Sequence, residues 1–188
     1  PQQVDNFGYR GRRWLTPILR WVERLMIRRS DAVIVICEDL ETTARRVRPD
    51  VPVVLIENAP GSGDRPTSAT GAAIRANLGL AADTPVALYT GTFEHYQGLD
   101  LLYAAMARVL AVRPDAKLVL VGGEPAQVAA ARVDIARHGI AGAVVLTGQR
   151  PAEEIPAYLD AATVLVSPRS TGTNTPLKIY QYLRSGRP

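Results

Sequence analysis

The sequence predicts an α/β protein built on a doubly wound parallel sheet. From residue 72 onward, apolar runs of strand length alternate with segments of helical period. Short loops join them, and several of these loops begin with glycine directly after an expected strand. Alternating strands and helices with short connections form parallel sheets with right-handed crossovers. Residues 118–121 are apolar throughout, which is typical of a strand covered on both faces.

The composition is that of a globular protein with one domain or parts of two. The chain has 188 residues, of which 47% are hydrophobic and 21% are charged, both ordinary values. No apolar run approaches the roughly 20 residues of a membrane-spanning helix. The single cysteine, Cys37, lies in an apolar run and is expected to be a buried structural thiol. One cysteine also fits a reducing compartment, so we expect a cytoplasmic protein.

The net charge of +4 is concentrated near the N-terminus. Residues 1–30 carry seven arginines and two acidic residues, a net charge of +5, so the other 158 residues sum to −1. A nucleic-acid-binding protein is expected to carry its basic charge across the binding domain. We therefore expect one local cationic surface and no nucleic-acid partner.

Residues 14–29 are predicted to form a basic amphipathic helix. Apolar side chains recur at helical spacing, and the arginines occupy other faces. Two interpretations stay open, because such a helix can lie on an anionic membrane surface or dock its apolar stripe on a sheet. A strand over 32–37, a helix over 38–47 and a strand over 52–57 are predicted to follow.

Residues 59–71 are rich in Pro, Gly, Ser and Thr and are predicted to be a linker. This linker divides the chain into residues 1–58 and 72–188. The second part is predicted to alternate between helices and strands, in the order helix 72–78, strand 85–90, helix 99–113, strand 117–121, helix 125–138, strand 143–147, helix 152–160, strand 163–167 and a last helix ending at Gly186.

Four strand-to-helix turns are expected to meet at one edge of this sheet. They lie at Gly91, Gly122-Gly123, Gly148 and residues 167–175. The carboxyl ends of parallel strands share an edge, and glycine there lets a ligand approach the backbone. In the last turn, Thr175 suits the N-cap and Pro176 the first position of the following helix. The start of that helix predicts a site for a phosphate or diphosphate anion.

Several common catalytic and cofactor motifs are absent. The sequence has no G-x-x-x-x-G-K-[ST] phosphate loop, no G-x-G-x-x-G dinucleotide fingerprint and no G-x-S-x-G nucleophile elbow. His95 and His138 have no partners at metal-ligand spacing. We therefore expect neither a metal site nor a bound cofactor.

Six motifs follow one another in a specific order: YTGTFEHYQGLDLL at 89–102, LVLVGG at 118–123, LTGQR at 146–150, IPAYL at 155–159, VLVSP at 164–168 and TPLKIYQY at 175–182. Together they resemble the nucleotide-sugar half of retaining GT-B glycosyltransferases of family 4. Residues 30–37 and 54–60 resemble the last elements before that family's interdomain crossover.

The resemblance implies a Rossmann-like piece of a GT-B enzyme, truncated at both ends. Residues 1–58 would be the C-terminal part of the acceptor-side N-terminal domain. Residues 72–188 would be most of the nucleotide-sugar-binding C-terminal domain. The implied activity is transfer of a hexosyl or other glycosyl group from a nucleotide diphosphate sugar to an acceptor, with retention. This piece is expected to be inactive by itself.

The acceptor and the catalytic residues are left open by the sequence. A lipid-linked or cell-envelope glycan is one expected class of acceptor, because the basic helix over 14–29 would hold the enzyme at the inner face of a membrane. The only other expected ligand is the nucleotide sugar donor.

The resemblance also assigns donor-binding residues. Gly91 and Thr92 would lie against the distal phosphate, and the backbone around Gln149 and Arg150 would face the base. The backbone amides of the last turn would cradle the diphosphate. That turn comprises Asn174, Thr175, Pro176 and Leu177.

The chain departs from the family's preferences at four donor-site positions. Thr92 stands where arginine is frequent, and Gln97 where lysine is frequent. Thr173 and Gln181 replace two common glutamates, although Gln181 can still hydrogen-bond a ribose. The nearby cations that would compensate are Lys178, Arg169 and Arg150. These departures keep open a second interpretation, a nucleotide-binding or regulatory module without transferase activity.

Overall fold

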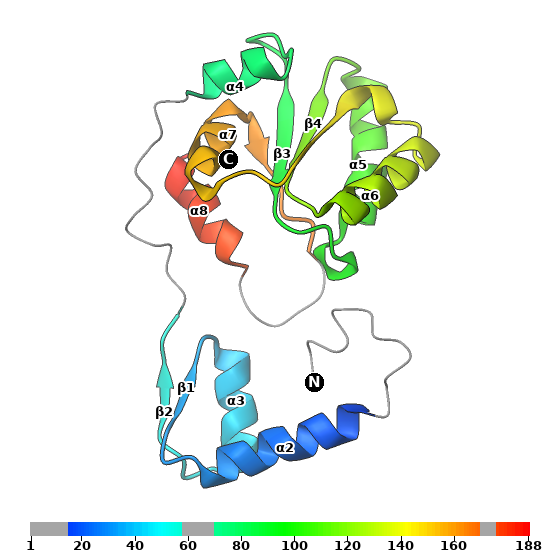
Figure 1. The fold of residues 1–188 in the computed structure, drawn as a ribbon. Coiled ribbons are helices and arrows are strands. Elements are labelled where there is room, and N and C mark those ends of the chain that lie inside the picture. Colours follow the sequence, from blue (N-terminus) through cyan, green and yellow to red (C-terminus); the bar gives the residue numbers. More distant parts are fainter. Residues whose placement is uncertain (1–14, 58–69, 170–175) are drawn as a thin grey trace. The chain divides into compact units, whose positions relative to one another are not determined.

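The computed structural model describes residues 15–57, 70–169 and 176–188 (Figure 1). The contacts between residues divide the chain into two compact units. Of the described residues, the first unit holds 15–57 together with 176–177, and the second holds 70–169 and 178–188. Each unit has a parallel sheet of its own.

The first unit is a strand–helix–strand element preceded by one long helix. Its elements are α2 (Leu15–Arg29), β1 (Val33–Val35), α3 (Glu38–Val47) and β2 (Val53–Leu55). The two strands are parallel, with Val33 opposite Val53. Helix α3 makes the crossover between them and also contacts α2.

Arg48 ties the ends of the two helices of this unit together. It follows α3, and its guanidinium donates hydrogen bonds to the carbonyl oxygens of Ser30 at 2.8 Å and Arg28 at 3.5 Å. The last carbonyl groups of a helix have no partner within the helix, so a guanidinium satisfies them well. This contact fixes the end of α2 against the end of α3.

The apolar stripe of α2 is largely exposed. Met26 is 66% exposed, Trp21 is 63% exposed, and Ile18 is exposed beside them. Among the described residues, no sheet covers this stripe. None of the described helices is long and apolar enough to cross a bilayer.

Cys37 differs from the expectation of a buried thiol in a strand. Strand β1 ends at Val35, because its pairing with β2 covers only three residues. Cys37 lies beyond that pairing as the N-cap residue of α3, where it is half-buried. The apolar run over 32–37 therefore overstated both the length of the strand and the burial of its last residue.

The second unit is the doubly wound parallel sheet that the sequence predicts. The strand order is β5-β4-β3-β6, and all pairs are parallel. The chain runs outward from β3 through β4 to β5 and then returns to the other side of β3. The strands are β3 (Val86–Thr90), β4 (Lys117–Val121), β5 (Val144–Gly148) and β6 (Val164–Leu165). The predicted α/β fold is confirmed.

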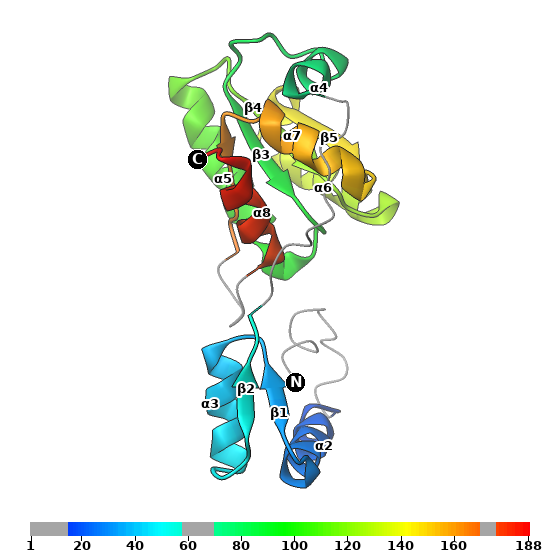
Figure 2. The same ribbon diagram turned by 90° about the vertical axis from the view of Figure 1, so that its left-hand side faces the viewer.

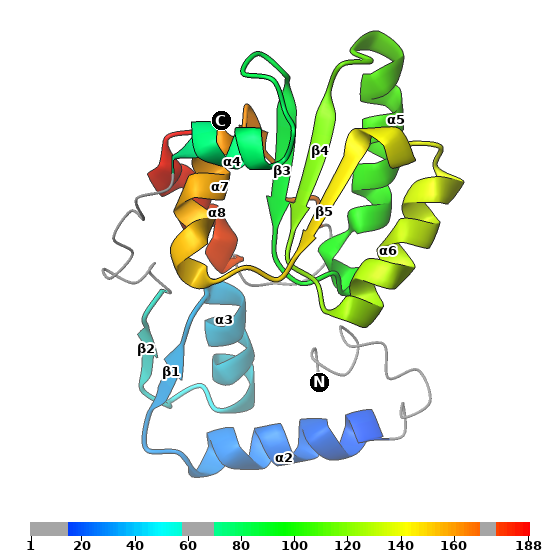
Figure 3. The ribbon, with the colours of Figure 1, turned by 45° about the horizontal axis from the view of Figure 1, so that its top comes forward.

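Helices cover both faces of this sheet (Figure 3). Helices α5 (Leu99–Val112) and α6 (Pro125–Arg137) cover one face. Helices α4 (Gly71–Asn77), α7 (Ile155–Ala161) and α8 (Leu177–Ser185) cover the other. In the quarter-turned view, α8 runs beside β3 (Figure 2).

Successive side chains of each strand are buried on opposite faces of the sheet, as expected when both faces are covered. On β4, Leu118 and Leu120 pack with α5 and α6, and Val119 and Val121 pack with the helices of the opposite face. All four are almost fully buried.

Two predicted helix starts differ from the structure. The helix predicted over 152–160 is a 3₁₀ turn (Ala152–Glu154) followed by α7, with Pro156 in the first turn of α7. Proline lacks an amide hydrogen and is tolerated at a helix start but not in its interior. At the last helix, α8 begins at Leu177, so Pro176 precedes it. The predicted end at Gly186 is confirmed by its positive φ of 69°.

Neighbouring leucines on α5 allow a matched test of this core. Leu102 is 7% exposed and Leu101 is 59% exposed. We expect Leu102→Ala to lower the free energy of unfolding by about 2–5 kcal/mol, because it removes packed methyl groups and leaves a cavity. Leu101→Ala should change it by about 0.5 kcal/mol or less. Urea denaturation measures both, and equal losses would contradict the assignment of the buried face.

Candidate functional site

Three turns meet at the carboxyl edge of the second unit's sheet. The amide of Gly91 donates to the carbonyl oxygen of Val121 at 3.0 Å. The amide of Gly122 donates to the carbonyl oxygen of Gly148 at 2.8 Å. These bonds join the turns after β3, β4 and β5 into one surface, as the sequence predicts for adjacent parallel strands.

A cavity of about 390 Å³ lies over these turns. Six of the residues predicted to bind the donor line it: Gly91, Thr92, Gln149, Arg150, Lys178 and Gln181. The other lining residues are Thr90, Val121, Gly122, Gly123 and Ile155. The structure therefore brings together residues that are up to 91 positions apart in the chain.

Two glycines keep the floor of this cavity open. Gly91 and Gly122 have φ angles of 139° and 121°, which L residues with a side chain rarely adopt. A Cβ atom on Gly122 would collide with the carbonyl oxygen of Gly91. A Cβ atom on Gly91 would come within 3.0 Å of the Lys178 Nζ atom. A ligand can thus approach backbone and ammonium together.

Lys178 supplies a partly buried cation at this floor. Its Nζ atom lies 3.9 Å from the ring centroid of Tyr89, in cation–π geometry. The same atom donates to the Oε1 atom of Gln97 at 3.2 Å. Burial, with a smaller contribution from Arg169, lowers the pKa of Lys178 to about 8. Its positive charge is therefore present at neutral pH but is easily lost above it.

Gln97 and Tyr89 hold the turn that Lys178 faces. Gln97 is 8% exposed, and its Nε2 atom donates to the Thr92 hydroxyl at 3.5 Å. The Tyr89 hydroxyl donates to the Thr92 carbonyl oxygen at 2.7 Å. Gln97 therefore does not line the cavity itself. It fixes the positions of two residues that do.

Tyr182 anchors α8 to the end of β3. Its hydroxyl accepts a hydrogen bond from the Thr90 amide at 2.9 Å and lies 3.2 Å from the Thr90 side-chain oxygen. Burial raises the pKa of Tyr182, so the hydroxyl stays neutral. Because Tyr182 lies one helical turn after Lys178, this anchor sets where the ammonium group stands.

The cavity is cationic. Lys178 and Arg150 line it, and no acidic side chain does so among the described residues. Within those ranges, no three His, Cys, Asp or Glu side chains are placed to hold a metal ion. The arrangement suits an anionic ligand that pairs with two positive charges.

The remaining predicted residues are placed differently. Arg169 does not line the cavity, and its guanidinium lies 5.4 Å from the ring centroid of Tyr96. Pro176 and Leu177 stand at the start of α8 without lining the cavity. The other predicted members of the last turn, namely Thr173, Asn174 and Thr175, lie outside the described residues.

Sequence reasoning missed Tyr89, Tyr182 and Ile155. The first two read as strand and helix core residues, which they also are. Their polar roles depend on partners that only the fold brings close. Ile155 had been assigned to the interior of a helix, yet it begins α7 and so reaches the cavity.

Comparison with known proteins identifies the family. Residues 84–188 match the family described as "Glycosyl transferases group 1". The chain belongs to this family. The chain is 26% identical over 157 residues to the alpha-D-kanosaminyltransferase of Streptomyces kanamyceticus, covering 81% of the chain and 40% of that protein.

Solved structures of other proteins share its fold. Sucrose-phosphate synthase from Thermosynechococcus elongatus is 29% identical with a TM-score of 0.73, covering 89% of the chain and 42% of that protein. Anabaena HepE, solved in complex with UDP-glucose, is 22% identical with a TM-score of 0.75, covering 90% of the chain and 46% of HepE. The group 1 chain thus spans less than half the length of these relatives.

Because Lys178 titrates near neutrality, anion binding should depend on pH. A bound diphosphate favours the charged ammonium, so affinity should be full below pH 8 and fall as the pH rises above it. We expect UDP affinity to drop about tenfold or more between pH 7 and 9.5, a range in which its terminal phosphate stays ionised. Titration calorimetry measures this.

Lys178→Arg is the control for that titration. A guanidinium keeps its charge throughout this range, so the variant should show little change in affinity. A wild-type chain whose affinity also stays constant would show that Lys178 does not face the anion.

Proposed function

We propose that this group 1 glycosyltransferase acts from a nucleotide diphosphate sugar, and that the cavity over β3, β4 and β5 holds the donor's diphosphate. The observation that carries the proposal is the Lys178 ammonium group, held on the Tyr89 ring directly beside the backbone of Gly91. A cation in a partly buried site, next to open backbone, is suited to a phosphate group.

In this proposal, different lining residues contact different parts of the donor. Gly91 and Thr92 lie with Lys178 at the distal phosphate. The backbone of Gln149 and Arg150 faces the base, and Gln181 binds the ribose hydroxyls through its amide. A neutral amide forms weaker bonds to ribose than a carboxylate does. Affinity for the nucleoside part therefore rests more on shape and on backbone contacts.

The chemistry that this arrangement supports is stabilisation of a leaving group. When the sugar departs, negative charge develops on the diphosphate, and preorganised cations nearby lower the barrier. Lys178 and Arg150 provide that charge, and the proposal invokes no metal ion or cofactor. Transfer with retention, as in family 4, is proposed from the motif resemblance. The complex of HepE with UDP-glucose makes UDP the first nucleotide to test.

We assign residues 72–188 to the donor-binding domain, residues 59–71 to the linker and residues 1–58 to the end of an acceptor-side domain. Ile34, Val54 and Ile56 are exposed on the two-stranded sheet of the first unit. Such a face is normally covered, because two strands alone are marginally stable. In this assignment the remainder of an acceptor-side domain covers it, and this chain alone does not catalyse transfer.

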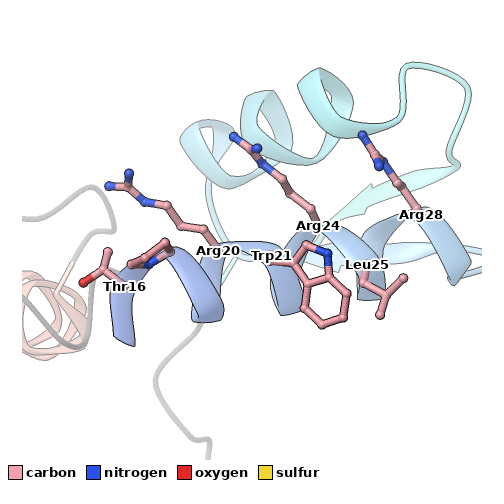
Figure 4. A pocket seen from close by; sticks show the side chains of 7 residues that line it. Thr16, Arg20, Trp21, Arg24, Leu25 and Arg28 are labelled. Carbon is pink, nitrogen blue, oxygen red and sulfur yellow. The ribbon is translucent and has the colours of Figure 1, made fainter. Parts of the chain in front are cut away.

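Helix α2 is the proposed contact with a membrane. Figure 4 shows Arg20, Arg24 and Arg28 projecting from the same side of the helix, with Trp21 and Leu25 below them. These residues line a cavity of about 630 Å³. The three arginines form no ion pair with any acidic side chain in the described ranges. Arginine beside an exposed tryptophan is typical of helices lying on anionic lipid.

We further propose that the enzyme acts in the cytoplasm at the inner face of a membrane, where a lipid-linked or cell-envelope acceptor would be within reach. The single cysteine, Cys37, agrees with a reducing compartment. Location and acceptor class are both parts of the proposal.

Lys178→Ala tests the donor site. We expect UDP to bind the wild-type chain and to bind Lys178→Ala about 10- to 100-fold more weakly, because a charge-assisted bond is lost. Ligand-observed NMR or calorimetry measures this, with circular dichroism to confirm folding. Lys117→Ala is the matched control, since Lys117 lies outside the cavity and donates to the Gly142 carbonyl oxygen.

Equal UDP affinity of Lys178→Ala and wild type would contradict the assignment of this cavity as the donor site. UDP, GDP and ADP compared in parallel identify the base. If the full-length enzyme binds a nucleotide at this site but transfers no sugar, the non-catalytic nucleotide-binding module is the correct interpretation.

Vesicle co-sedimentation tests the membrane contact. We expect the chain to bind phosphatidylglycerol vesicles and not phosphatidylcholine vesicles. Replacing Arg20, Arg24 and Arg28 by glutamine should weaken binding about 100-fold, at about 1 kcal/mol for each arginine. The charge-matched control replaces three exposed arginines of the second unit, Arg108, Arg113 and Arg132. Similar losses of vesicle binding in both triple variants would show that binding depends only on the net charge of the chain.

A further inference from the structure

A second cavity, of about 400 Å³, lies between α5 and α6 on the other face of the sheet from α8. The turn after β3 closes one end of it through Phe93, Glu94 and His95. Leu99, Asp100 and Tyr103 line it from α5. From α6 it is lined by Ala126, Gln127, Ala130, Ala131 and Asp134. Its volume is that of a small-molecule site.

The charge of this cavity is opposite to that of the donor cavity. Three carboxylates line it, from Glu94, Asp100 and Asp134, and among the described lining residues there is no lysine or arginine. Nearby basic side chains compensate only part of the negative charge of these three carboxylates. Asp134 pairs with Arg137 at 2.9 Å, and Asp100 lies 3.9 Å from the His95 ring. A net negative cavity is notable in a chain whose net charge is +4.

A buried hydroxyl without a partner lies in the same cavity wall. Tyr103 is 2% exposed, and its hydroxyl makes no hydrogen bond in the described structure. Buried polar groups are almost always paired, and an unpaired one calls for a ligand or an ordered water. Burial, with smaller contributions from Asp134 and Asp100, raises the pKa of Tyr103 to about 12. The hydroxyl is thus neutral and able to accept a hydrogen bond.

One wall of the cavity is held rigidly. The Gln127 side chain donates to Glu94 at 2.7 Å, and its oxygen accepts from the Glu124 amide at 3.0 Å. Gln127 therefore fixes the Glu94 carboxylate at the mouth of the cavity. The alanines of α6 leave space for an aliphatic segment beside these polar groups.

We propose that the cavity between α5 and α6 binds a small organic ammonium ligand, with Asp100 and Asp134 pairing with the cation and the Tyr103 hydroxyl accepting one of its N–H bonds. An alkylammonium supplies what each wall lacks. It brings positive charge to the carboxylates, a donor to Tyr103 and methylene groups to the alanines.

A metal ion fits the cavity less well. Among the described residues, no three carboxylate, imidazole or thiol groups stand close enough together to coordinate one. An ammonium group needs only hydrogen-bond distances to separate acceptors. This site is independent of the donor site, because the two cavities share no lining residue.

The test uses 1,4-diaminobutane as the probe and 1,4-butanediol as its neutral counterpart. We expect the diamine, added to the ¹⁵N-labelled chain, to shift amide resonances of α5 and α6, and the diol to leave them unchanged. Asp134→Asn should weaken diamine binding about tenfold or more, the effect of losing a charged partner. Glu153→Gln is the control, because it removes an exposed carboxylate outside the cavity.

Tyr103→Phe distinguishes a role of the hydroxyl in diamine binding from a role in stability. Because the hydroxyl has no partner in the described structure, the melting temperature should stay the same or rise, while diamine affinity falls. Equal responses to diamine and diol, no response to either, or unchanged affinity in Asp134→Asn would each overturn the proposal. In that case an ordered water satisfies Tyr103.

Discussion

The hydrogen bond from the Thr90 amide to the Tyr182 hydroxyl holds the functional edge of this protein together. It joins the last residue of β3 to the middle of α8, two elements far apart in the chain. One turn before Tyr182, Lys178 is thereby placed over the Tyr89 ring and beside Gly91. This buried contact helps to orient α8 at the cavity.

That placement links neutral side chains at the edge of the sheet to one partly buried cation. Gln97 cannot neutralise a phosphate, but it accepts a hydrogen bond from Lys178 and donates one to Thr92. The cations that line this cavity are Lys178 and Arg150. Partial burial holds the ammonium group at the floor of the cavity and at the same time lowers its pKa.

The turn after β3 separates two cavities of opposite charge. Gly91 and Thr92 face the cationic cavity over the sheet edge, and Phe93 and Glu94 face the acidic one between α5 and α6. These four consecutive residues thus line cavities on both sides of the sheet. The backbone that leaves the central strand β3 passes from one layer to the other. On the acidic side, the Gln127 amide holds the Glu94 carboxylate at 2.7 Å.

The sequence alone determined the alternation of strands and helices, the parallel sheet and the glycine turns at its edge. These features depend on local periodicity and backbone preferences, which each segment carries by itself. The tertiary structure decided which side chains meet. Lys178 and Gln97 are 81 residues apart, and Arg169 turns to Tyr96 instead of the cavity. The exposed stripe of α2 and the half-buried Cys37 were likewise decided by packing, because burial depends on neighbours that local pattern does not specify.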